Sequence, residues 1–196
     1  MVITVGVFLF IFTGVWIAVQ VFGLRIYTLA ATKLVATTGG RQALNQIRDQ
    51  IREAKMVYVG SNSTVSASSF HLIPNTQPQQ GNALIIYPST NTTWYSIYYL
   101  DTSTPTNCLV QFNVSNNVTI YTKTLAMYLT NRIVFDARDF QNNIVTNYQS
   151  LDNRVLIEMT MQFSQWEYPI AVVGGVGLNA YDYYQLRTRV FRRAWN

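Results

Sequence analysis

The sequence has little of the chemistry that most catalytic and metal sites require. Its 196 residues include one cysteine, Cys108, and one histidine, His71. A single cysteine excludes an intrachain disulfide and a zinc site built from several thiolates. A single histidine excludes a centre with several imidazole ligands and leaves any histidine-dependent triad to His71 alone. We therefore expect no enzyme activity and no cofactor, with His71 structural or at the surface and Cys108 packed as a small buried side chain.

Charge is also scarce and unevenly distributed. Charged residues make up 12% of the chain, against about 25% in a typical soluble domain. No ionisable side chain precedes Arg25, and Asp101 is the only formal charge between Met56 and Thr122. The net charge of +5 is concentrated after the apolar N-terminus and in the last ten residues. This distribution favours anchoring and packing over nucleic-acid binding.

The uncharged N-terminus predicts a membrane-spanning helix. Residues 2–24 are almost entirely apolar, and a helix of about 20 residues crosses a hydrocarbon core of roughly 30 Å. A secretory signal peptide and a buried soluble helix are the alternatives, and the signal peptide fits poorly because no positive residue precedes the run. The residues that we expect to contact lipid or neighbouring helices are Val7, Phe8, Phe10, Ile11, Gly14, Val15 and Ile17.

The positive charges that flank this segment lie on the side opposite to the one expected for an exported domain. Arg25, Lys33 and Arg41 follow the span and no positive residue precedes it, so the positive-inside rule would place the large domain in the cytoplasm. The nearly uncharged, Asn- and Thr-rich stretch from Met56 to Thr122 is instead typical of an exported domain. We expect that the natural chain begins upstream of Met1 and carries the balancing charges there.

Helical periodicity continues beyond the apolar segment to residue 55. Leu44, Ile47, Ile51 and Ala54 recur at intervals of three and four, which predicts one apolar face that packs on the following domain. Gly39 and Gly40 interrupt the helix-forming residues, so we expect a kink or a melted turn there. A continuous helix over residues 2–55 would be roughly 80 Å long.

The remainder predicts a β domain with polar, uncharged loops. Runs of β-branched and aromatic residues alternate with Asn, Ser, Thr, Pro and Gly clusters. The sequence therefore predicts an α+β fold, in which a long N-terminal helix packs on a mainly antiparallel sheet. Its parts are a transmembrane or filament-core helix (1–24), an amphipathic continuation (25–55) and an exported β domain (56–196). The expected strands are 56–59, 69–73, 83–87, 94–100, 109–114, 118–122, 132–135, 155–165 and 184–193, with a hairpin turn at 115–117 and a loop over 169–183.

Three groups of residues in the β domain are candidates for binding. Asp136, Asp139 and Asn142 place hard oxygen ligands in an expected loop, where calcium is possible although the spacing is not that of an EF-hand. The basic group Arg187, Arg189, Arg192 and Arg193 predicts a salt-bridging or packing face, with phosphate as the alternative. The aromatic group predicts either a binding surface or core packing, and consists of Trp94, Tyr95, Tyr98, Tyr99, Tyr181, Tyr183 and Tyr184.

Four segments of the chain resemble a known family. They are Phe22-Gly-Leu-Arg-Ile-Tyr-Thr-Leu-Ala-Ala-Thr-Lys-Leu34, the helix end at residues 41–55, Pro78-Gln-Gln-Gly-Asn-Ala-Leu-Ile-Ile-Tyr-Pro88 and the C-terminal segment at residues 181–194. Together with the order of helix and sheet, they are similar to type IV pilin-like proteins and to the pseudopilins of type II secretion. The processing motif of that family is not present, because position 5 is Val5 where the family has a glutamate.

The resemblance implies a mechanical role. It implies a subunit of a type IV pilus-like or type II secretion pseudopilus filament, held in the bacterial inner membrane before assembly, with its β domain periplasmic or extracellular. Its partners would be other pilin or pseudopilin subunits, inner-membrane lipid and the assembly machinery. The alternative is a single-pass, membrane-anchored envelope binding protein that does not polymerise and holds a ligand on its tyrosine-rich face.

Overall fold

The computed structural model describes residues 2–103, 106–146, 155–169 and 179–193. The chain divides into two compact units, Met1–Thr37 and Thr38–Asn196. The helix α1 (Val2–Glu53) forms the first unit and continues into the second. It is followed by β1 (Met56–Ser61), the 3-10 turn η1 (Ala67–Ser69), β2 (His71–Leu72), β3 (Gln80–Gly81), β4 (Ala83–Tyr87), β5 (Trp94–Asp101), β6 (Cys108–Ser115), β7 (Val118–Met127), β8 (Phe135–Arg138), β9 (Leu156–Pro169) and β10 (Asn179–Phe191).

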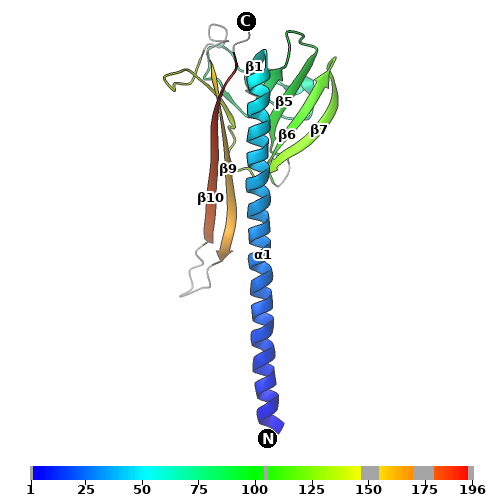
Figure 1. The fold of residues 1–196 in the computed structure, drawn as a ribbon, viewed down its shortest axis with the longest axis vertical. Helices are drawn as coiled ribbons and strands as arrows, with labels where there is room; N and C mark the ends of the chain where they lie inside the picture. Colours follow the sequence, from blue (N-terminus) through cyan, green and yellow to red (C-terminus); the bar gives the residue numbers. More distant parts are fainter. Residues whose placement is uncertain (1, 104–105, 147–154, 170–178, 194–196) are drawn as a thin grey trace. The chain divides into compact units, whose positions relative to one another are not determined.

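Two antiparallel sheets make up the second unit. The described strands form a six-stranded sheet in the order β2-β1-β4-β5-β6-β7 and a four-stranded sheet in the order β10-β9-β8-β3. The end of α1 that belongs to this unit lies between β9 and β10 on one side and β5–β7 on the other (Figure 1). The fold is therefore α+β, with an N-terminal apolar helix and a mainly antiparallel β domain.

The central strands of the six-stranded sheet are buried on both faces. On β5, Tyr95, Ile97 and Tyr99 point to one face and belong to an apolar cluster, whereas Tyr98 on the opposite face contacts α1. The side chains of Ile97, Tyr98 and Tyr99 are at most 1% exposed. Burial on two faces explains why the sequences of β4 and β5 are nearly continuous apolar runs, without strict alternation.

The predicted melted turn at Gly39 and Gly40 is wrong, because both residues are helical within α1, which runs from Val2 to Glu53. The structure gives both glycines a different role. A Cβ on Gly40 would lie 2.8 Å from Cζ of Phe163 and 3.1 Å from Cδ1 of Leu186, and a Cβ on Gly39 would lie 3.2 Å from the backbone oxygen of Leu125. These glycines allow strands to approach the helix backbone closely. The cost in helix propensity, about 1 kcal/mol each, is offset by this packing.

The structure confirms most of the predicted strands and corrects several predicted bounds. Of the predicted strand at 69–73, only His71–Leu72 is a strand, because Ser69 belongs to the 3-10 turn η1. The turn between β6 and β7 is the expected hairpin, and Asn116 and Asn117 adopt φ values of 51° and 63°, as a type I′ turn requires. The predicted strand at 132–135 is displaced toward the C-terminus, since β8 spans Phe135–Arg138. Residues 179–183, expected in a loop, belong to β10. The helix also ends before Lys55, whose backbone N–H bonds to the Tyr87 carbonyl.

Candidate functional site

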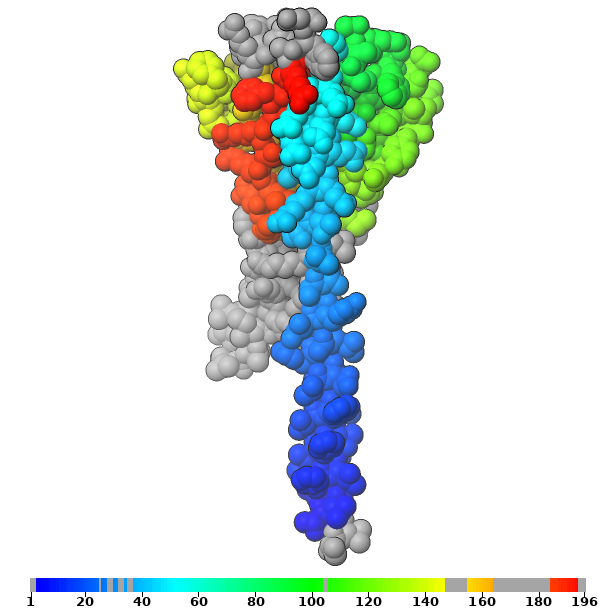
Figure 2. Space-filling model, viewed as in Figure 1, coloured from blue at the N-terminus to red at the C-terminus, as the bar shows by residue number. Residues whose placement is uncertain are grey.

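The apolar segment of α1 is the first candidate site. Residues Ile3–Leu24 form a helix of 22 residues with a mean hydropathy of 2.3, and none of that apolar window is buried within the structure. Its length and composition suffice to cross a membrane, although a signal sequence has the same properties. Figure 2 shows the side chains of this segment, in blue, projecting outward along the visible face of the helix.

The residues predicted to form the membrane or assembly surface are all exposed, and they occupy one half of the helix surface. The exposed fractions are 55% for Val7, 71% for Phe8, 81% for Phe10, 58% for Ile11, 58% for Val15 and 57% for Ile17, and nothing lies within 4 Å of a Cβ built on Gly14. The hydroxyl of Thr13 donates to the Leu9 carbonyl at 2.5 Å, so this polar group is satisfied within the helix. A helix that is apolar all round requires lipid or other helices around it.

The second part of α1, in the second unit, is amphipathic. The four residues predicted to face the sheet are buried, with exposed fractions of 7% for Leu44, 0% for Ile47, 0% for Ile51 and 1% for Ala54. Arg41, Asn45 and Asp49 are exposed. Burial of this stripe of apolar side chains makes the helix end part of the domain core.

A polar network that sequence reasoning missed links this helix end to the six-stranded sheet. Gln46 Nε2 donates to Oε1 of Gln111 at 2.6 Å, and the Tyr98 hydroxyl donates to Oε1 of Gln50 at 2.7 Å. Gln111 is 3% exposed, and burial raises the pKa of Tyr98 well above its usual value despite the hydrogen bond from Gln46. Because buried amides are costly without partners, this network fixes the register between α1 and strands β5 and β6.

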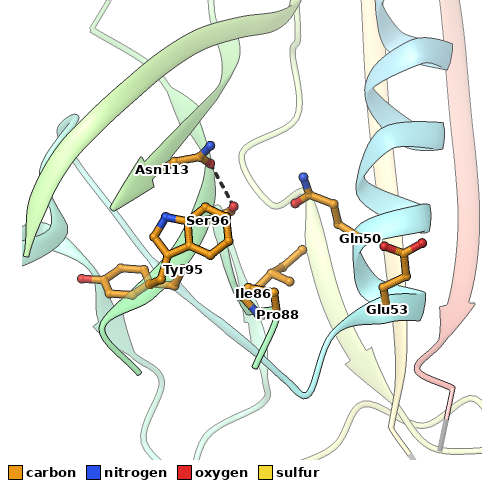
Figure 3. Close-up of a pocket in the computed structure, with 8 residues that line it drawn as sticks. Gln50, Glu53, Ile86, Pro88, Tyr95, Ser96 and Asn113 are labelled. Carbon is orange, nitrogen blue, oxygen red and sulfur yellow. Dashed lines mark hydrogen bonds between the residues drawn. The ribbon is translucent and has the colours of Figure 1, made fainter. Parts of the chain in front are cut away.

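A small cavity of about 210 Å³ opens beside this network (Figure 3). Gln50 and Glu53 line it from α1, while Ser96 and Asn113 line it from β5 and β6. The Ser96 hydroxyl bonds to Oδ1 of Asn113 at 2.9 Å. Glu53 is the one carboxylate among the described lining residues, and no hydrogen bond between it and the Ser96 hydroxyl is found.

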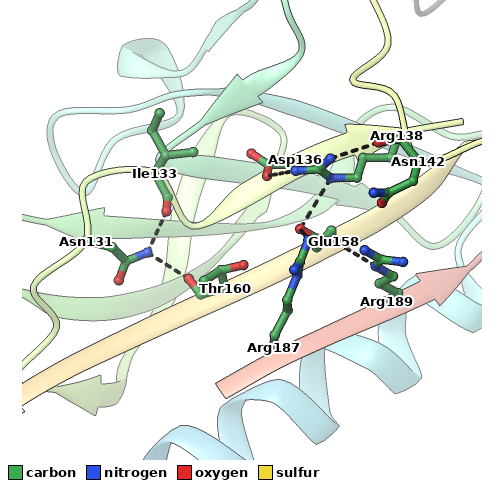
Figure 4. Close-up of polar contacts among 9 residues, drawn as sticks. All are labelled: Asn131, Ile133, Asp136, Arg138, Asn142, Glu158, Thr160, Arg187 and Arg189. Atoms are coloured by element: carbon green, nitrogen blue, oxygen red, sulfur yellow. Dashed lines mark hydrogen bonds and ion pairs between the residues drawn. The ribbon is translucent and has the colours of Figure 1, made fainter. Parts of the chain in front are cut away.

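The C-terminal arginines separate into two groups with different partners. On the outer face of the four-stranded sheet, Arg187 and Arg189 each bond to Glu158 at 2.5 Å (Figure 4). Nε of Arg138 lies 3.3 Å from the Glu158 carboxylate, and Nη2 of Arg138 lies 3.1 Å from Oδ2 of Asp136. This cluster, named here the arginine–carboxylate network, therefore holds three guanidinium groups and two carboxylates. The predicted salt-bridging face is confirmed for Arg187 and Arg189.

The two carboxyl groups of the network have opposite pKa shifts. Burial raises the pKa of Glu158, whose side chain is 2% exposed. The hydrogen bonds from Arg187 and Arg189 lower that pKa by more than burial raises it, so the pKa of Glu158 is below its usual range. Burial also raises the pKa of Asp136, and Arg138 compensates only in part, so that pKa stays above its usual range. Asp136 and Glu158 lie opposite each other in register, which adds to this difference.

The remaining arginines contact the last turn of α1 and the residues just after it. Arg192 donates from its guanidinium to the Lys55 carbonyl, and the backbone N–H of Arg193 donates to the Arg52 carbonyl at 3.3 Å. The last carbonyl groups of a helix lack intrahelical partners, and a cation near them interacts favourably with the negative end of the helix dipole. The C-terminal segment thus caps the C-terminal end of the helix.

The structure does not arrange the calcium candidates as expected. Asp136 lies in strand β8, outside the expected loop, and its carboxylate pairs with Arg138. Arg138 also donates to the Asn142 carbonyl at 2.9 Å, and Asp139 Oδ1 accepts from the backbone N–H of Asn143 at 2.8 Å. The Arg138 guanidinium therefore bonds both to the Asp136 carboxylate and to the backbone carbonyl of Asn142. In the part of the chain that the structure describes, no group of three or more His, Cys, Asp or Glu side chains is placed to hold a metal ion.

The other candidates are dispersed over the domain. His71 is exposed on β2, and Cys108 is buried at the start of β6. Among the aromatic candidates, Tyr95, Tyr98 and Tyr99 are buried in the sheet, while Trp94 is 51% exposed. The side chains of Tyr181 and Tyr183 lie outside the described part. Core packing, one of the two expectations for this group, is confirmed for Tyr95, Tyr98 and Tyr99.

Comparison of the chain with family models, with curated proteins and with solved structures found no match. The resemblance to pilin-like proteins stays a prediction from the sequence.

Proposed function

We propose that this protein is a structural subunit of a pilin-like filament, of the type IV pilus or type II secretion pseudopilus kind. In this proposal the apolar part of α1 anchors the subunit in the bacterial inner membrane and then packs against the helices of other subunits. The β domain is exported and lies on the outside of the filament. The partners are membrane lipid, further pilin-like subunits and the machinery that assembles them.

One observation carries the proposal. A single unbroken helix contains an apolar segment, Ile3–Leu24, that is exposed on all sides, and an end whose apolar face is buried in the β domain. Large side chains such as Phe8, Phe10 and Trp16 are 59–81% exposed. Exposed apolar area costs about 25 cal/mol per Å² in water, so this segment requires a nonpolar environment. Lipid satisfies the requirement before assembly, and neighbouring helices satisfy it afterwards.

The test uses the chain in its native cells, with an epitope tag in the exposed turn at Asn116. We expect the protein to stay in the membrane fraction after alkaline carbonate extraction and to appear, with other subunits, in the material sheared from cells. A chain released by carbonate contradicts membrane anchoring. A chain that stays in the membrane but is monomeric in every fraction contradicts assembly.

The second candidate is the envelope binding protein that is anchored by one helix and does not polymerise. It is favoured by a surface cavity of about 530 Å³ on the face of the six-stranded sheet away from α1. Aromatic side chains line this cavity, and its volume is in the range of small-molecule sites. The shearing test distinguishes the two functions, because only the filament subunit leaves the membrane in polymeric form.

A further inference from the structure

The cavity on the six-stranded sheet is built from a row of tyrosines on adjacent strands. Tyr58 on β1, Tyr87 on β4 and Tyr95 on β5 all line it. The ring centroids of Tyr58 and Tyr87 are 6.3 Å apart at 78°, and those of Tyr87 and Tyr95 are 5.2 Å apart at 49°. Aromatic rings at these separations and angles pack edge to face or tilted against one another, and they give the cavity apolar ring surface with polar hydroxyl groups.

The opposite wall of the cavity is held in place by close packing. Phe70 and His71 line it from the segment that leads into β2. This segment lies against Gly60, where a Cβ would be 2.6 Å from the His71 carbonyl oxygen and would also collide with the Phe70 ring. The absence of a side chain at Gly60 thus lets Phe70 and His71 pack directly against the backbone of β1.

Hydrogen bonds fix the loop behind this wall. Asn62 is 5% exposed, and its side chain donates to the Thr64 carbonyl at 2.8 Å and accepts from the Ser69 hydroxyl. Asn62 and Asn82 also exchange two further bonds, at 3.0 Å and 2.8 Å. A wall ordered in this way is formed before any ligand binds, which lowers the entropic cost of binding.

The chemistry of the lining selects a neutral ligand with both apolar and hydroxyl groups. Among the described residues that line the cavity there is no Asp, Glu, Lys or Arg. Burial raises the pKa of both Tyr87 and Tyr95, so their hydroxyls are neutral donors and acceptors. No hydrogen bond from either hydroxyl to another described residue is found, which leaves both available to a ligand.

We propose that this cavity binds the sugar rings of an uncharged glycan. A pyranose has a face of C–H groups, which stacks on a tyrosine ring, and a rim of hydroxyls, which bond to phenol, imidazole and threonine groups such as those of Tyr87, His71 and Thr92. An anionic glycan or phosphate lacks a cationic partner here, and a quaternary ammonium ligand lacks a carboxylate. The site does not depend on filament assembly, because all of these residues lie within the β domain.

The test measures binding to the full chain, purified in a detergent without a sugar headgroup. Maltotriose, cellotriose and chitotriose serve as neutral probes in saturation-transfer NMR, with a proline-rich peptide and choline measured in parallel. We expect at least one trisaccharide to bind, with saturation transferred to its C–H protons. Absence of binding by all three trisaccharides overturns the proposal, as does binding of only the peptide or only choline.

Two variants locate the binding. Tyr87→Ala removes the central ring, and Ala67→Phe fills the cavity while leaving all three tyrosines in place; Ala67 lies on its lining. We expect each to raise the Kd of the bound trisaccharide roughly tenfold or more, which corresponds to about 1.4 kcal/mol. Tyr121→Ala, at a tyrosine on β7 that is 48% exposed, is the matched control and leaves the Kd unchanged. Equal binding by wild type and by a folded Ala67→Phe variant overturns the assignment to this cavity, whatever the outcome of the membrane experiments.

Discussion

Gly40 of α1 lies against the ring of Phe163 on β9, so close that a Cβ at position 40 would be 2.8 Å from Cζ of the ring. The same helix residue faces Leu186 on β10, and Gly39, one residue earlier, faces the backbone of β7. The glycine pair therefore marks the level at which strands of both sheets converge on the helix. This contact is a stabilising feature of the second unit, and it can be tested by mutation.

We expect Gly40→Ala to destabilise the β domain by about 1 kcal/mol. The gain in helix propensity, about 1 kcal/mol, is smaller than the cost of overpacking against Phe163. Unfolding of the full chain in detergent by urea, followed by tyrosine and tryptophan fluorescence, measures this loss. Gly23→Ala is the control, because nothing lies within 4 Å of a Cβ there. A Gly40→Ala protein as stable as wild type would contradict the packing role.

The buried amide network predicts a coupled effect of Gln46 and Gln111. Changing Gln111 to leucine leaves the Gln46 amide without its partner at 2.6 Å, and we expect a loss of about 1–3 kcal/mol. The double variant Gln46→Leu/Gln111→Leu removes both polar groups and is expected to recover part of that loss. Urea unfolding of the single and double variants gives the coupling energy. Strict additivity of the two single losses would show that the amides do not act as a pair.

The sequence predicted much of the architecture for definite physical reasons. Periodicity over residues 44–54 identified the apolar stripe, since a helix at a domain surface buries only one face. The Asn116-Asn117 pair identified the hairpin turn, because both residues tolerate positive φ. The role of Gly40 and the partners of Gln111 were not predictable. Both depend on which distant strand lies opposite, and local propensity contains no information on that.

The candidate sites were predicted less well than the fold. Asp136 was assigned to a loop because acidic and Asn residues cluster after it, yet it pairs with Arg138 inside a strand. Glu158, the centre of the arginine–carboxylate network, looked like an ordinary strand residue, and only its register opposite Arg189 reveals its role. The tyrosine cavity is formed by Tyr58, Tyr87 and Tyr95 on three strands. Their spacing in the sequence follows no regular pattern, so the sequence did not indicate that they lie together.

Loss of the Glu158 charge is expected to be the most damaging single change in the arginine–carboxylate network. Glu158→Gln leaves Arg138, Arg187 and Arg189 without their shared partner, and Glu158 itself is 2% exposed. We expect a loss of about 2–3 kcal/mol, below the roughly 3–5 kcal/mol of fully buried pairs because Arg187 and Arg189 reach solvent. Asp49→Asn, which breaks an exposed pair with Arg48, should cost less than about 0.5 kcal/mol. Equal losses in the two variants would contradict this assignment.

The opposite pKa shifts of Glu158 and Asp136 predict opposite effects on the pH dependence of stability. The lowered pKa of Glu158 contributes stability above its unfolded pKa of about 4.3, and this is lost as the pH falls through the folded-state pKa. The raised pKa of Asp136 contributes stability below about pH 3.9, and this is lost as the pH rises through its folded-state pKa. The Asp136→Asn variant should therefore lose stability more steeply than wild type between about pH 6 and pH 3.

Urea midpoints measured at several pH values give this slope directly. Asp136→Asn should also be no less stable than wild type at neutral pH, because the amide resembles the protonated acid that the site favours. A shallower acid slope in this variant than in wild type would contradict the direction of the Asp136 shift.

Cross-linking of the apolar helix in native membranes tests the central claim, that this segment packs against other subunits. Single cysteines replace successive residues from Val7 to Ile17 in a Cys108→Ser background, and Val118→Cys on the exposed edge strand β7 serves as the control. After oxidation we expect covalent dimers or cross-links to other pilin-like subunits whose yield peaks every three to four residues along the helix. A chain that stays in the membrane and gives no cross-link at any of these helix positions would contradict the filament assignment.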